Sequence, residues 1–306
     1  MSNPLVSVVI PTYSRPMYLK RCIDSVLGQT YNNIEIFVVD DNNPDTVDRK
    51  ETEIVMQEYL NNDKVTYLKH PQNKNGSAAR NTGWKHSAGK YITFIDDDDE
   101  IDKKKIEIQV RCLESLDDTW GACYTGYRII SEYECNQVST ENRSGDCYID
   151  ALMRTMFMGS GSNLFLRKSV VDQINGYDES FKRNQDIEFM ARALEHYKLA
   201  YIDEILLVIH QEGNRKTTSF EILDGYSQHY LEKFQNRINA LSKNDRERVL
   251  SVISLERCRL AFYKKRFAKG ISILQENDVK LKYIFRYVRY LVKRKVTHQS
   301  YGFNGK

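Results

Sequence analysis

Three short runs rich in apolar and β-branched residues alternate with segments in which apolar residues recur at helical spacing. These runs cover residues 5–10, 34–39 and 91–95, all in the first hundred residues. Such runs are typical of strands that are buried on both faces of a parallel sheet. The alternation therefore predicts βαβ units and an α/β fold with a mostly parallel sheet flanked by helices.

The segments between and after these runs set the expected order of elements. Apolar residues three or four positions apart indicate amphipathic helices, and Gly, Pro, Asn and Asp clusters indicate turns. From residue 220 to about 295 the pattern is helical, with loops expected near Ser242, Gly270 and Asn277. Further helices are predicted over 14–27, 47–60, 77–87, 103–116 and 185–196, and strands over 65–68 and 201–209.

Composition places the chain among ordinary globular proteins. Hydrophobic residues make up 41% of the 306 residues and charged residues 28%. The six cysteines are scattered without a C-x-x-C pair, which indicates reduced thiols and disfavours a cysteine-based zinc site. The sequence shows neither a signal-peptide pattern nor an uninterrupted apolar run of about 18 residues, so we expect a cytoplasmic protein.

Polar clusters follow three of the expected strands at the point where each strand ends. They are Pro11-Thr12, Asp40-Asp41 and the run from Asp96 to Asp99. Parallel strands bring their carboxyl ends to one edge of a sheet, and ligands of open α/β sheets bind there. We therefore expect these three clusters to form one binding site.

Four adjacent aspartates repel one another unless a cation offsets their charge. Carboxylate oxygens are the preferred ligands of Mg²⁺ and Mn²⁺, which also bind substrate phosphates. Asp96 to Asp99 can therefore form a metal and diphosphate site, or only a solvated acidic loop. Their position directly after a buried strand favours the metal site. His210, which ends another expected strand, is a further candidate metal ligand, although a structural role is the commoner one for a lone histidine.

Several segments, in this order, resemble one known family, the family-2 inverting glycosyltransferases with the GT-A fold. The resemblance covers about residues 5 to 215. The segments that carry it are Ser7 to Tyr13, Gln29-Thr30-Tyr31, Ile36 to Asn42, Asn75-Gly76, Ala79-Arg80-Asn81, Ala88 to Asp99, Gly176 to Glu179 and Gln185-Asp186.

The resemblance implies a donor site, a metal ligand and a general base. Thr12 and Asp41 would contact the nucleotide base, Asp98 would ligate Mn²⁺ or Mg²⁺, and Asp186 would take the proton from an acceptor hydroxyl. A register error of one residue would move the metal ligand to Asp97 or Asp99. The whole implied nucleotide-sugar-binding set is Pro11, Thr12, Asp40, Asp41, Arg80, Asp96 and Asp97.

One segment departs from the family pattern, and two others also fit a purely structural role. The family usually has a Glu-Asp pair where this chain has Gln185-Asp186, so the pKa of Asp186 should be raised less. Asp40 and Asp41 also fit an Asx-turn or a helix N-cap before Val47. Ser160 to Asn163 can line an acceptor pocket or form an ordinary turn.

The implied organisation is a catalytic domain over 1–219, with a nucleotide-sugar half (1–100) and an acceptor half (101–219), followed by a helical basic region over 220–306. The expected reaction moves a sugar, with inversion, from a nucleotide-sugar, favoured as a UDP-sugar, to a glycan or lipid-linked acceptor. Cell-surface polysaccharide or glycolipid synthesis is the expected setting.

Rival functions have weaker support. A nucleotidyltransferase or dehydrogenase needs a glycine-rich loop after the first strand, and 11–15 contains no glycine. A non-catalytic carbohydrate- or lipid-binding protein on a degenerate transferase fold remains an alternative, which the intact aspartates and Asp186 disfavour. Nucleic-acid binding by the basic C-terminal region is a third option, which the net acidic remainder of the chain disfavours, so no nucleic-acid partner is expected.

That C-terminal region has its own charge pattern. Residues 255–306 contain 14 Lys and Arg against 3 Asp and Glu, so they carry +11 while the remainder carries −8. Leu281, Ile284, Phe285, Val288, Leu291 and Val292 recur at helical spacing. A basic amphipathic helix of this kind can lie on an anionic membrane or pack on the catalytic domain. We expect the membrane, at the inner face of the cell membrane.

Overall fold

The computed structural model describes residues 3–131, 136–211 and 218–305. It divides into two compact units. Unit 1 comprises Met1–Asp146 and Met158–Gln211, and unit 2 comprises Cys147–Phe157 and Glu212–Lys306. Residues 147–157 therefore group with the C-terminal helices, whereas the sequence placed them in the acceptor half of the catalytic domain.

The N-terminal half of unit 1 is a parallel sheet. Strand β1 (Val6–Thr12) is buried along its whole length and pairs in parallel with β2 (Ile34–Asp40) and β4 (Tyr91–Phe94). Strand β3 (Val65–Lys69) extends the sheet in parallel beside β2. The mainly apolar runs thus form the centre of a parallel sheet, as their composition predicts.

The second half of unit 1 adds antiparallel pairs to the same sheet. Strand β8 (Phe165–Arg167) lies antiparallel between β4 and β6 (Trp120–Ser131). The order in the sheet is β7-β6-β8-β4-β1-β2-β3, with β7 spanning Gln137–Ser139. Strand β9 (Lys198–Gln211) runs parallel to β6 and antiparallel to β5 (Asp99–Ile101). The structure is therefore the expected α/β fold, but its sheet is mixed where the sequence predicted a mostly parallel one.

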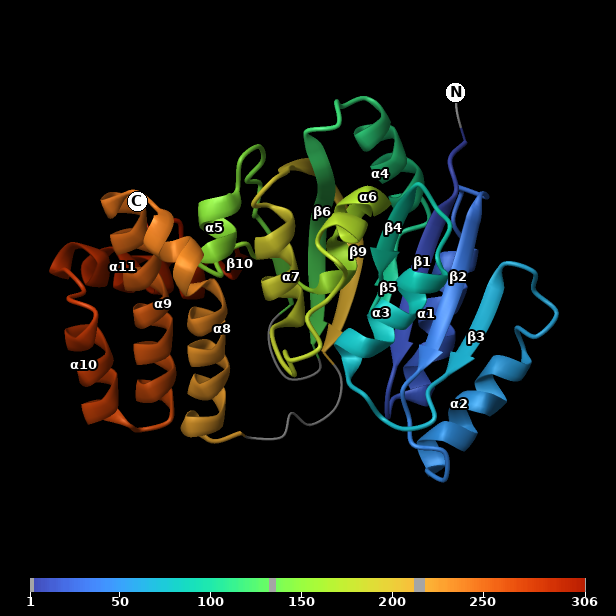
Figure 1. Ribbon diagram of the computed structural model, residues 1–306, viewed down its shortest axis with the longest axis horizontal. Coiled ribbons are helices and arrows are strands. Elements are labelled where there is room, and N and C mark those ends of the chain that lie inside the picture. The colour runs from blue at the N-terminus through green and yellow to red at the C-terminus, as the bar shows by residue number, and fades with distance from the viewer. Residues whose placement is uncertain (1–2, 132–135, 212–217, 306) are drawn as a thin grey trace. The chain divides into compact units, whose positions relative to one another are not determined.

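Helices flank this sheet, as Figure 1 shows. Helix α1 buries the predicted apolar positions Leu19, Cys22, Ile23 and Val26. The helices of unit 1 are α1 (Pro16–Leu27), α2 (Val47–Gln57), α3 (Gly76–His86), α4 (Lys105–Glu114), α6 (Lys168–Gln173) and α7 (Gln185–Ala193), with a short 3₁₀ turn at Gly161–Asn163.

Helix α3 approaches β1 unusually closely. A Cβ atom on Gly83 would lie 2.3 Å from Cγ1 of Val9, so only glycine fits at this contact. The N-cap residue Asn75, whose side chain accepts from the backbone N–H of Ser77 and Ala78, fixes where the helix begins. Together these features hold Arg80, on α3, beside the end of the sheet.

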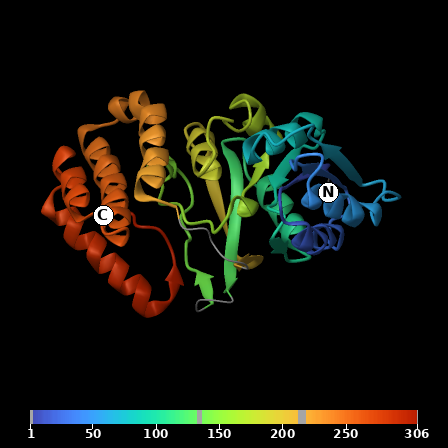
Figure 2. The ribbon, with the colours of Figure 1, turned by 90° about the horizontal axis from the view of Figure 1, so that it is seen from below.

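Unit 2 is helical. It contains α5 (Tyr148–Leu152), α8 (Phe220–Ala240), α9 (Lys243–Tyr263), α10 (Phe267–Glu276) and α11 (Leu281–Thr297), with a short strand β10 (Gln299–Ser300). Figure 2 shows α11 as the long red helix of this unit. Helices α8 and α9 are joined by a buried ion pair in which Arg257 contacts both oxygens of Asp224, at 2.6 and 2.9 Å.

The predicted loops near Ser242 and Asn277 are confirmed as the N-cap of α9 and the C-cap of α10. The predicted loop near Gly270 is wrong. Gly270 lies inside α10, where a Cβ atom would come within 2.4 Å of Cε1 of Phe262. This glycine permits close helix packing rather than a break, and the turn lies at 264–266 instead.

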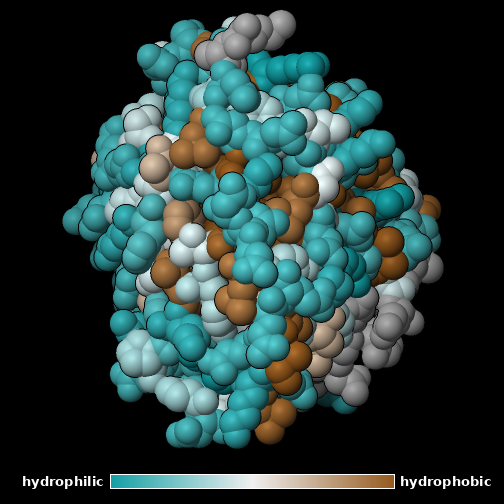
Figure 3. Space-filling model, turned by 90° about the vertical axis from the view of Figure 1, so that its right-hand side faces the viewer, coloured by the Kyte–Doolittle hydropathy of each residue, from teal (hydrophilic) through white to brown (hydrophobic). Residues whose placement is uncertain are grey.

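Within the described ranges, no helix combines the length and apolarity needed to cross a bilayer. The described cysteines Cys22, Cys112, Cys123, Cys147 and Cys258 are free thiols, and Cys135 lies outside the described residues. Figure 3 shows the face of the protein that carries α2 and β3, which is mostly hydrophilic with scattered hydrophobic side chains.

Candidate active site

The three polar clusters lie at one edge of the sheet. Thr12 and Asp40 are register partners at the ends of β1 and β2, and the backbone N–H of Asp41 donates to the carbonyl of Thr12 at 2.9 Å. Strand β4, also parallel to β1, ends at Phe94, just before the aspartate run. The structure thus brings these clusters to one end of the parallel sheet, as expected for its carboxyl edge.

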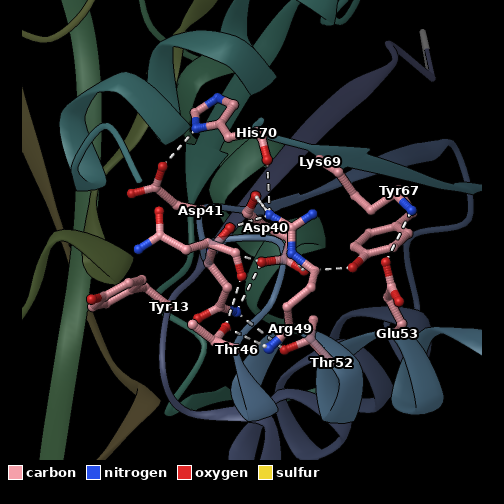
Figure 4. Close-up of polar contacts among 12 residues, drawn as sticks. Tyr13, Asp40, Asp41, Thr46, Arg49, Thr52, Glu53, Tyr67, Lys69 and His70 are labelled. Atoms are coloured by element: carbon pink, nitrogen blue, oxygen red, sulfur yellow. Dashed lines mark hydrogen bonds and ion pairs between the residues drawn. The ribbon is translucent and has the colours of Figure 1, made fainter. Parts of the chain in front are cut away.

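Asp40 is fully buried and its carboxylate is held by three neighbours (Figure 4). One oxygen accepts from the backbone N–H of Asn42 at 2.9 Å. The other accepts from the Tyr67 hydroxyl at 2.5 Å and lies 3.1 Å from Nε of Arg49. Burial raises the pKa of Asp40, and the Tyr67 hydrogen bond partly opposes that rise. This arrangement fixes the turn after β2.

Asp41 is also buried, and all four of its usual acceptor positions are occupied. One oxygen accepts from Nδ1 of His70 at 2.6 Å and from the backbone N–H of Lys74 at 2.8 Å. The other accepts from Nδ2 of Asn73 at 2.8 Å and from the backbone N–H of Asn75 at 2.9 Å. Asp41 therefore ties the segment that leads into α3 to the end of β2, and its role toward a nucleotide base stays a prediction.

The first three aspartates of the run are paired with arginines. Arg80 donates to Asp96 at 2.5 Å, and Arg15 lies 2.7 Å from Asp97 and also pairs with Asp98. Burial raises the pKa of Asp97 to about 7, which Arg15 partly opposes. Burial likewise raises the pKa of Asp98. Arg15 is a site residue that the sequence did not reveal, because only the fold brings 15 beside 97–98.

Asp99, the last of the run, begins β5 and is buried beneath the loop that follows Gly159. Its carboxylate accepts from the hydroxyls of Ser160 and Ser162, both at 2.6 Å. Burial raises the pKa of Asp99 well above its usual value. Lys105, which the sequence also missed, donates to the carbonyl of Ser162 at 3.3 Å, and burial lowers its pKa to about 8.

Arg80 connects the two sides of the site. Its guanidinium donates to Oδ1 of Asp96 at 2.5 Å and to Oε1 of Gln185 at 2.8 Å, and it lies 5.4 Å from the centre of the Tyr177 ring. Tyr177 in turn stacks on Phe189 of α7, with ring centres 4.1 Å apart. The fork of one arginine therefore fixes the aspartate run relative to the start of α7.

Two further segments of the family resemblance meet beside Arg80. The side chain of Asn81 donates to the carbonyl of Tyr177 at 2.9 Å and to the carboxylate of Glu179 at 2.9 Å. The backbone N–H of Tyr177 donates back to Asn81 at 2.7 Å. Residues almost a hundred positions apart thus form one rigid wall of the site.

A cavity of about 460 Å³ opens between these groups. Asp186, in the first turn of α7, lines it together with Asp96, and burial and then the charge of Asp96 raise the pKa of Asp186. The negative neighbour that Gln185 cannot supply is therefore supplied by Asp96. The full lining is Gly76, Arg80, Asp96, Gly159, Ser160, Gly161, Lys182, Arg183, Asn184, Gln185 and Asp186.

The two predicted metal ligands, Asp98 and His210, each have a charged partner within the chain. Nε2 of His210, on β9, is 3.1 Å from Glu100 on the adjacent strand β5, and Asp98 pairs with Arg15. Asp96 and Asp98 are partly exposed carboxylates in an environment with excess negative charge. In the described part of the chain no three His, Cys, Asp or Glu side chains converge on one point. The residues fit a hard divalent cation held by one or two carboxylates together with substrate phosphates.

Comparison with known proteins identifies the class of this site. Residues 7–174 match the family described as glycosyl transferase family 2, and the chain belongs to that family. The segments at the strand ends and around Arg80 lie inside this match.

Relatives from bacteria and archaea cover much of the chain. An uncharacterised glycosyltransferase of Rickettsia prowazekii is 29% identical over 83% of this chain and 80% of its own length. One of Methanocaldococcus jannaschii is 29% identical over 68% of this chain and 71% of its own length. The glycosyltransferase GlyA of Streptococcus pneumoniae is 38% identical, but over 33% of this chain and 14% of its own length.

Solved structures share the fold. Staphylococcus aureus TarS 1–349, in complex with UDP-GlcNAc, has a TM-score of 0.68 at 14% identity, over 96% of this chain and 88% of its own. The mannosyltransferase PcManGT of Pyrobaculum calidifontis, in complex with GDP-Man and Mn²⁺, has a TM-score of 0.59 at 16% identity, over 90% of this chain and 76% of its own. The fold is thus the GT-A fold that the sequence resemblance implied, and the chain is a glycosyltransferase.

Proposed function

We propose that this glycosyltransferase moves a sugar from a nucleotide-sugar, a UDP-sugar in the first instance, to an acceptor hydroxyl with inversion at the anomeric carbon. The observation that carries the proposal is the shared cavity of Asp96 and Asp186. Asp186, the candidate proton acceptor, and Asp96, on the proposed donor side, line the same space. Arg80 links them, because it donates to Asp96 and to Gln185, the residue before Asp186.

The donor half follows from the end of the parallel strands. The Tyr13 ring, 49% exposed beside the Asp40–Asp41 cluster, offers an aromatic face for a base to stack on. Arg15 and Arg80 present guanidinium groups suited to phosphate oxygens. Thr12 is the proposed contact of the base. Because all four acceptor positions of Asp41 are occupied, Asp41 would act on the base only through the segment that it holds.

Metal dependence belongs to the same proposal. Mn²⁺ or Mg²⁺, held by Asp98 with Asp96 nearby, would neutralise charge on the departing nucleoside diphosphate. The finding that supports this is the solved mannosyltransferase with Mn²⁺ and GDP-Man, which shares the fold. Within this chain the two side chains offer hard oxygen donors, whereas Asp97 and Asp99 are buried.

Asp186 is the proposed general base. One of its oxygens takes the proton of the acceptor hydroxyl while that hydroxyl oxygen forms a bond to the anomeric carbon. The bond from that carbon to the diphosphate oxygen breaks on the opposite face, which inverts the centre without an enzyme nucleophile. Burial beside Asp96 raises the pKa of Asp186, so its conjugate acid holds the proton better than an exposed aspartic acid would.

The acceptor and location complete the proposal. We infer a glycan or lipid-linked acceptor in cell-surface polysaccharide or glycolipid synthesis, with the enzyme working at the cytoplasmic face of the cell membrane. The supporting features are the family itself and the basic amphipathic C-terminal region.

The test is nucleotide release from a panel of UDP-, GDP- and dTDP-sugars by the full chain, with Mn²⁺ or Mg²⁺ and with chelator. We expect release from one class of donor, lost with chelator and in Asp98→Ala. Glu51→Ala, an exposed carboxylate on α2, is the matched control and should keep full activity. Full activity of Asp98→Ala in chelator would sink the metal-dependent mechanism. No release from any donor would favour the non-catalytic alternative.

A further inference from the structure

Helix α11 presents three distinct faces, and an aromatic one holds it to unit 2. Tyr283, Tyr287 and Tyr290 are buried, and the rings of Tyr287 and Tyr290 pack within 5.2 and 5.3 Å of Phe303. The Tyr290 hydroxyl donates to the carbonyl of Tyr301 at 2.7 Å. The packed face is therefore made of tyrosines, not of the aliphatic stripe seen in the sequence.

The aliphatic stripe points the other way. At about 100° per residue, five exposed members of the pattern fall within one sector of about 80° that is centred opposite the tyrosines. They are Leu281, Phe285, Val288, Val292 and Val296, between 52% and 73% exposed, and only these five are called the aliphatic stripe below. Ile284 and Leu291 lie beside this sector and are half-buried. Exposed singly such residues are ordinary, but a continuous stripe on one helix face marks an interaction surface.

Cations line one side of this stripe. Lys282, Arg286, Arg289 and Lys293 fall in the sector between the aliphatic stripe and the tyrosines, and α11 contains no acidic residue. Lys282 lies 3.6 Å from Glu247. Among the residues that the structure describes, no carboxylate lies within ion-pair distance of the other three. The charge on this flank is therefore largely uncompensated by the protein.

These cations also border a cavity. Arg286, Arg289 and Lys293 line a space of about 420 Å³, together with the ring of Tyr290 and the segment 301–304. Three cationic side chains lining one hollow suit a phosphate group. Because the cationic residues of the hollow adjoin the aliphatic stripe on the helix, a single amphiphile can place its anionic headgroup at the hollow and its apolar chains along the stripe.

We propose that α11 lies in the surface of an anionic phospholipid bilayer, its aliphatic stripe among the acyl chains and a headgroup phosphate at the Arg286–Arg289–Lys293 hollow. Apolar and cationic sectors side by side on one helix match this interface. A nucleic acid would leave the stripe in water, and a second copy of α11 would bring two cationic flanks together. The inference rests on the proposed function only for its purpose, which is to bring the enzyme to a lipid-linked acceptor.

The test is co-sedimentation of the full chain with vesicles of phosphatidylcholine, alone or mixed with phosphatidylglycerol. We expect binding to the mixed vesicles that weakens as salt rises, because screening shortens electrostatic attraction. Arg286→Gln with Arg289→Gln should weaken binding roughly 10- to 30-fold. Phe285→Ser with Val288→Ser should weaken it at least about tenfold. All four side chains are exposed, so the fold should survive.

The matched control is Val47→Ser with Ile54→Ser, two exposed apolar residues of α2, which should bind as the wild type does. Inorganic phosphate at matched ionic strength should not displace the protein; displacement would assign the hollow to free phosphate instead. Equal binding to both kinds of vesicle, equal loss in the control, or a wild-type dimer that the Phe285–Val288 change dissociates would overturn the proposal.

A second readout separates this inference from catalysis. In Phe285→Trp, the fluorescence emission of the new tryptophan should shift to shorter wavelength when anionic vesicles are added. The absence of a shift would contradict burial of the stripe in the bilayer. Nucleotide release without vesicles should be unchanged in the α11 variants, because they lie outside the catalytic machinery. Vesicle binding without any nucleotide release would contradict the proposed function and leave the membrane surface standing.

Discussion

The sheet edge of unit 1 and helix α11 of unit 2 both carry concentrated charge. They differ in whether the charged side chains have partners within the protein. At the edge, every carboxylate from Asp96 to Asp99 has an arginine or serine partner within the protein. On α11, Arg286 and Arg289 are exposed without a carboxylate partner in the described chain. Charge that is held internally fixes a geometry for chemistry. Charge without an internal partner remains available to bind a ligand or surface of opposite charge.

The largest expected effect comes from removing the proposed proton acceptor, Asp186, from the site at the sheet edge. Asp186→Asn keeps the shape but cannot take a proton, so kcat should fall by roughly 10²–10⁴. Donor affinity should be nearly unchanged, since Asp186 is proposed to contact the acceptor hydroxyl and not the donor. Steady-state kinetics with nucleotide titrations checks both quantities, with Glu195→Gln beyond the far end of α7 as control. A collapse of donor affinity would move Asp186 to the nucleotide site.

A buried pair in unit 2 should affect stability rather than rate. Asp224→Asn leaves Arg257 buried beside a neutral amide, and breaking such a pair costs about 3–5 kcal/mol. The urea midpoint of unit 2 should fall, while kcat at low temperature stays as in the wild type. An unchanged midpoint would show that the pair is not needed to hold α8 on α9.

The pH dependence of that stability has a definite sign. Burial alone would raise the pKa of Asp224, but Arg257 and Gln228 lower it below the usual value. A lowered pKa gives stability that is present above the unfolded pKa of about 4 and is lost as pH falls through the folded value. The wild type should therefore lose stability in acid faster than Asp224→Asn does, as denaturation at several pH values can check.

Replacing the Arg80 guanidinium, which contacts both Asp96 and Gln185, should have an intermediate effect on activity. Arg80→Lys keeps the charge, but one ammonium cannot hold Asp96 and Gln185 in the same geometry. We expect kcat/KM to fall about 10- to 100-fold, because small misplacements at a reacting site are costly. Arg111→Lys, on the exposed face of α4, is the control. Wild-type kinetics in Arg80→Lys would show that charge alone suffices at this position.

The smallest effect is expected from restoring the usual family pair. Gln185→Glu adds a negative charge near Asp186, and a like charge raises the pKa of a carboxyl group. The acid limb of the kcat/KM profile should then move to higher pH, by roughly 1 unit or less. A limb that moves to lower pH, or one that persists in Asp186→Asn, would show that Asp186 does not set it.

The sequence predicted the parallel half of the sheet because β1, β2 and β4 are buried runs of mainly apolar and β-branched residues. It missed β5 and β8 as strands, since three residues show no periodicity. On α11 it identified the aliphatic stripe, but not that tyrosines form the packed face. Tyrosine has a polar hydroxyl, and sequence alone does not show where the Tyr290 hydroxyl finds its acceptor.

The candidate site was predictable to the extent that its residues follow strand ends. Thr12, Asp40 and Asp96 were found in this way, and the family resemblance added Arg80 and Asp186. Arg15 and Lys105 were not found, because their partners at 97–98 and 162 are distant in sequence. The four bonds that occupy Asp41 were equally hidden, since they depend on the path of 70–75.

The composition of unit 2 from two separate stretches of chain has a consequence for synthesis on the ribosome. Helix α5 emerges early, yet the Tyr230 hydroxyl that donates to the carbonyl of Leu152 lies 78 residues later. At about 5–20 residues per second, roughly 4–16 seconds pass before this contact can form. During that interval Leu152 and Met153, both fully buried in the finished protein, lack their later partners. These two side chains are therefore open to chaperones, and to aggregation, until the later helices are made.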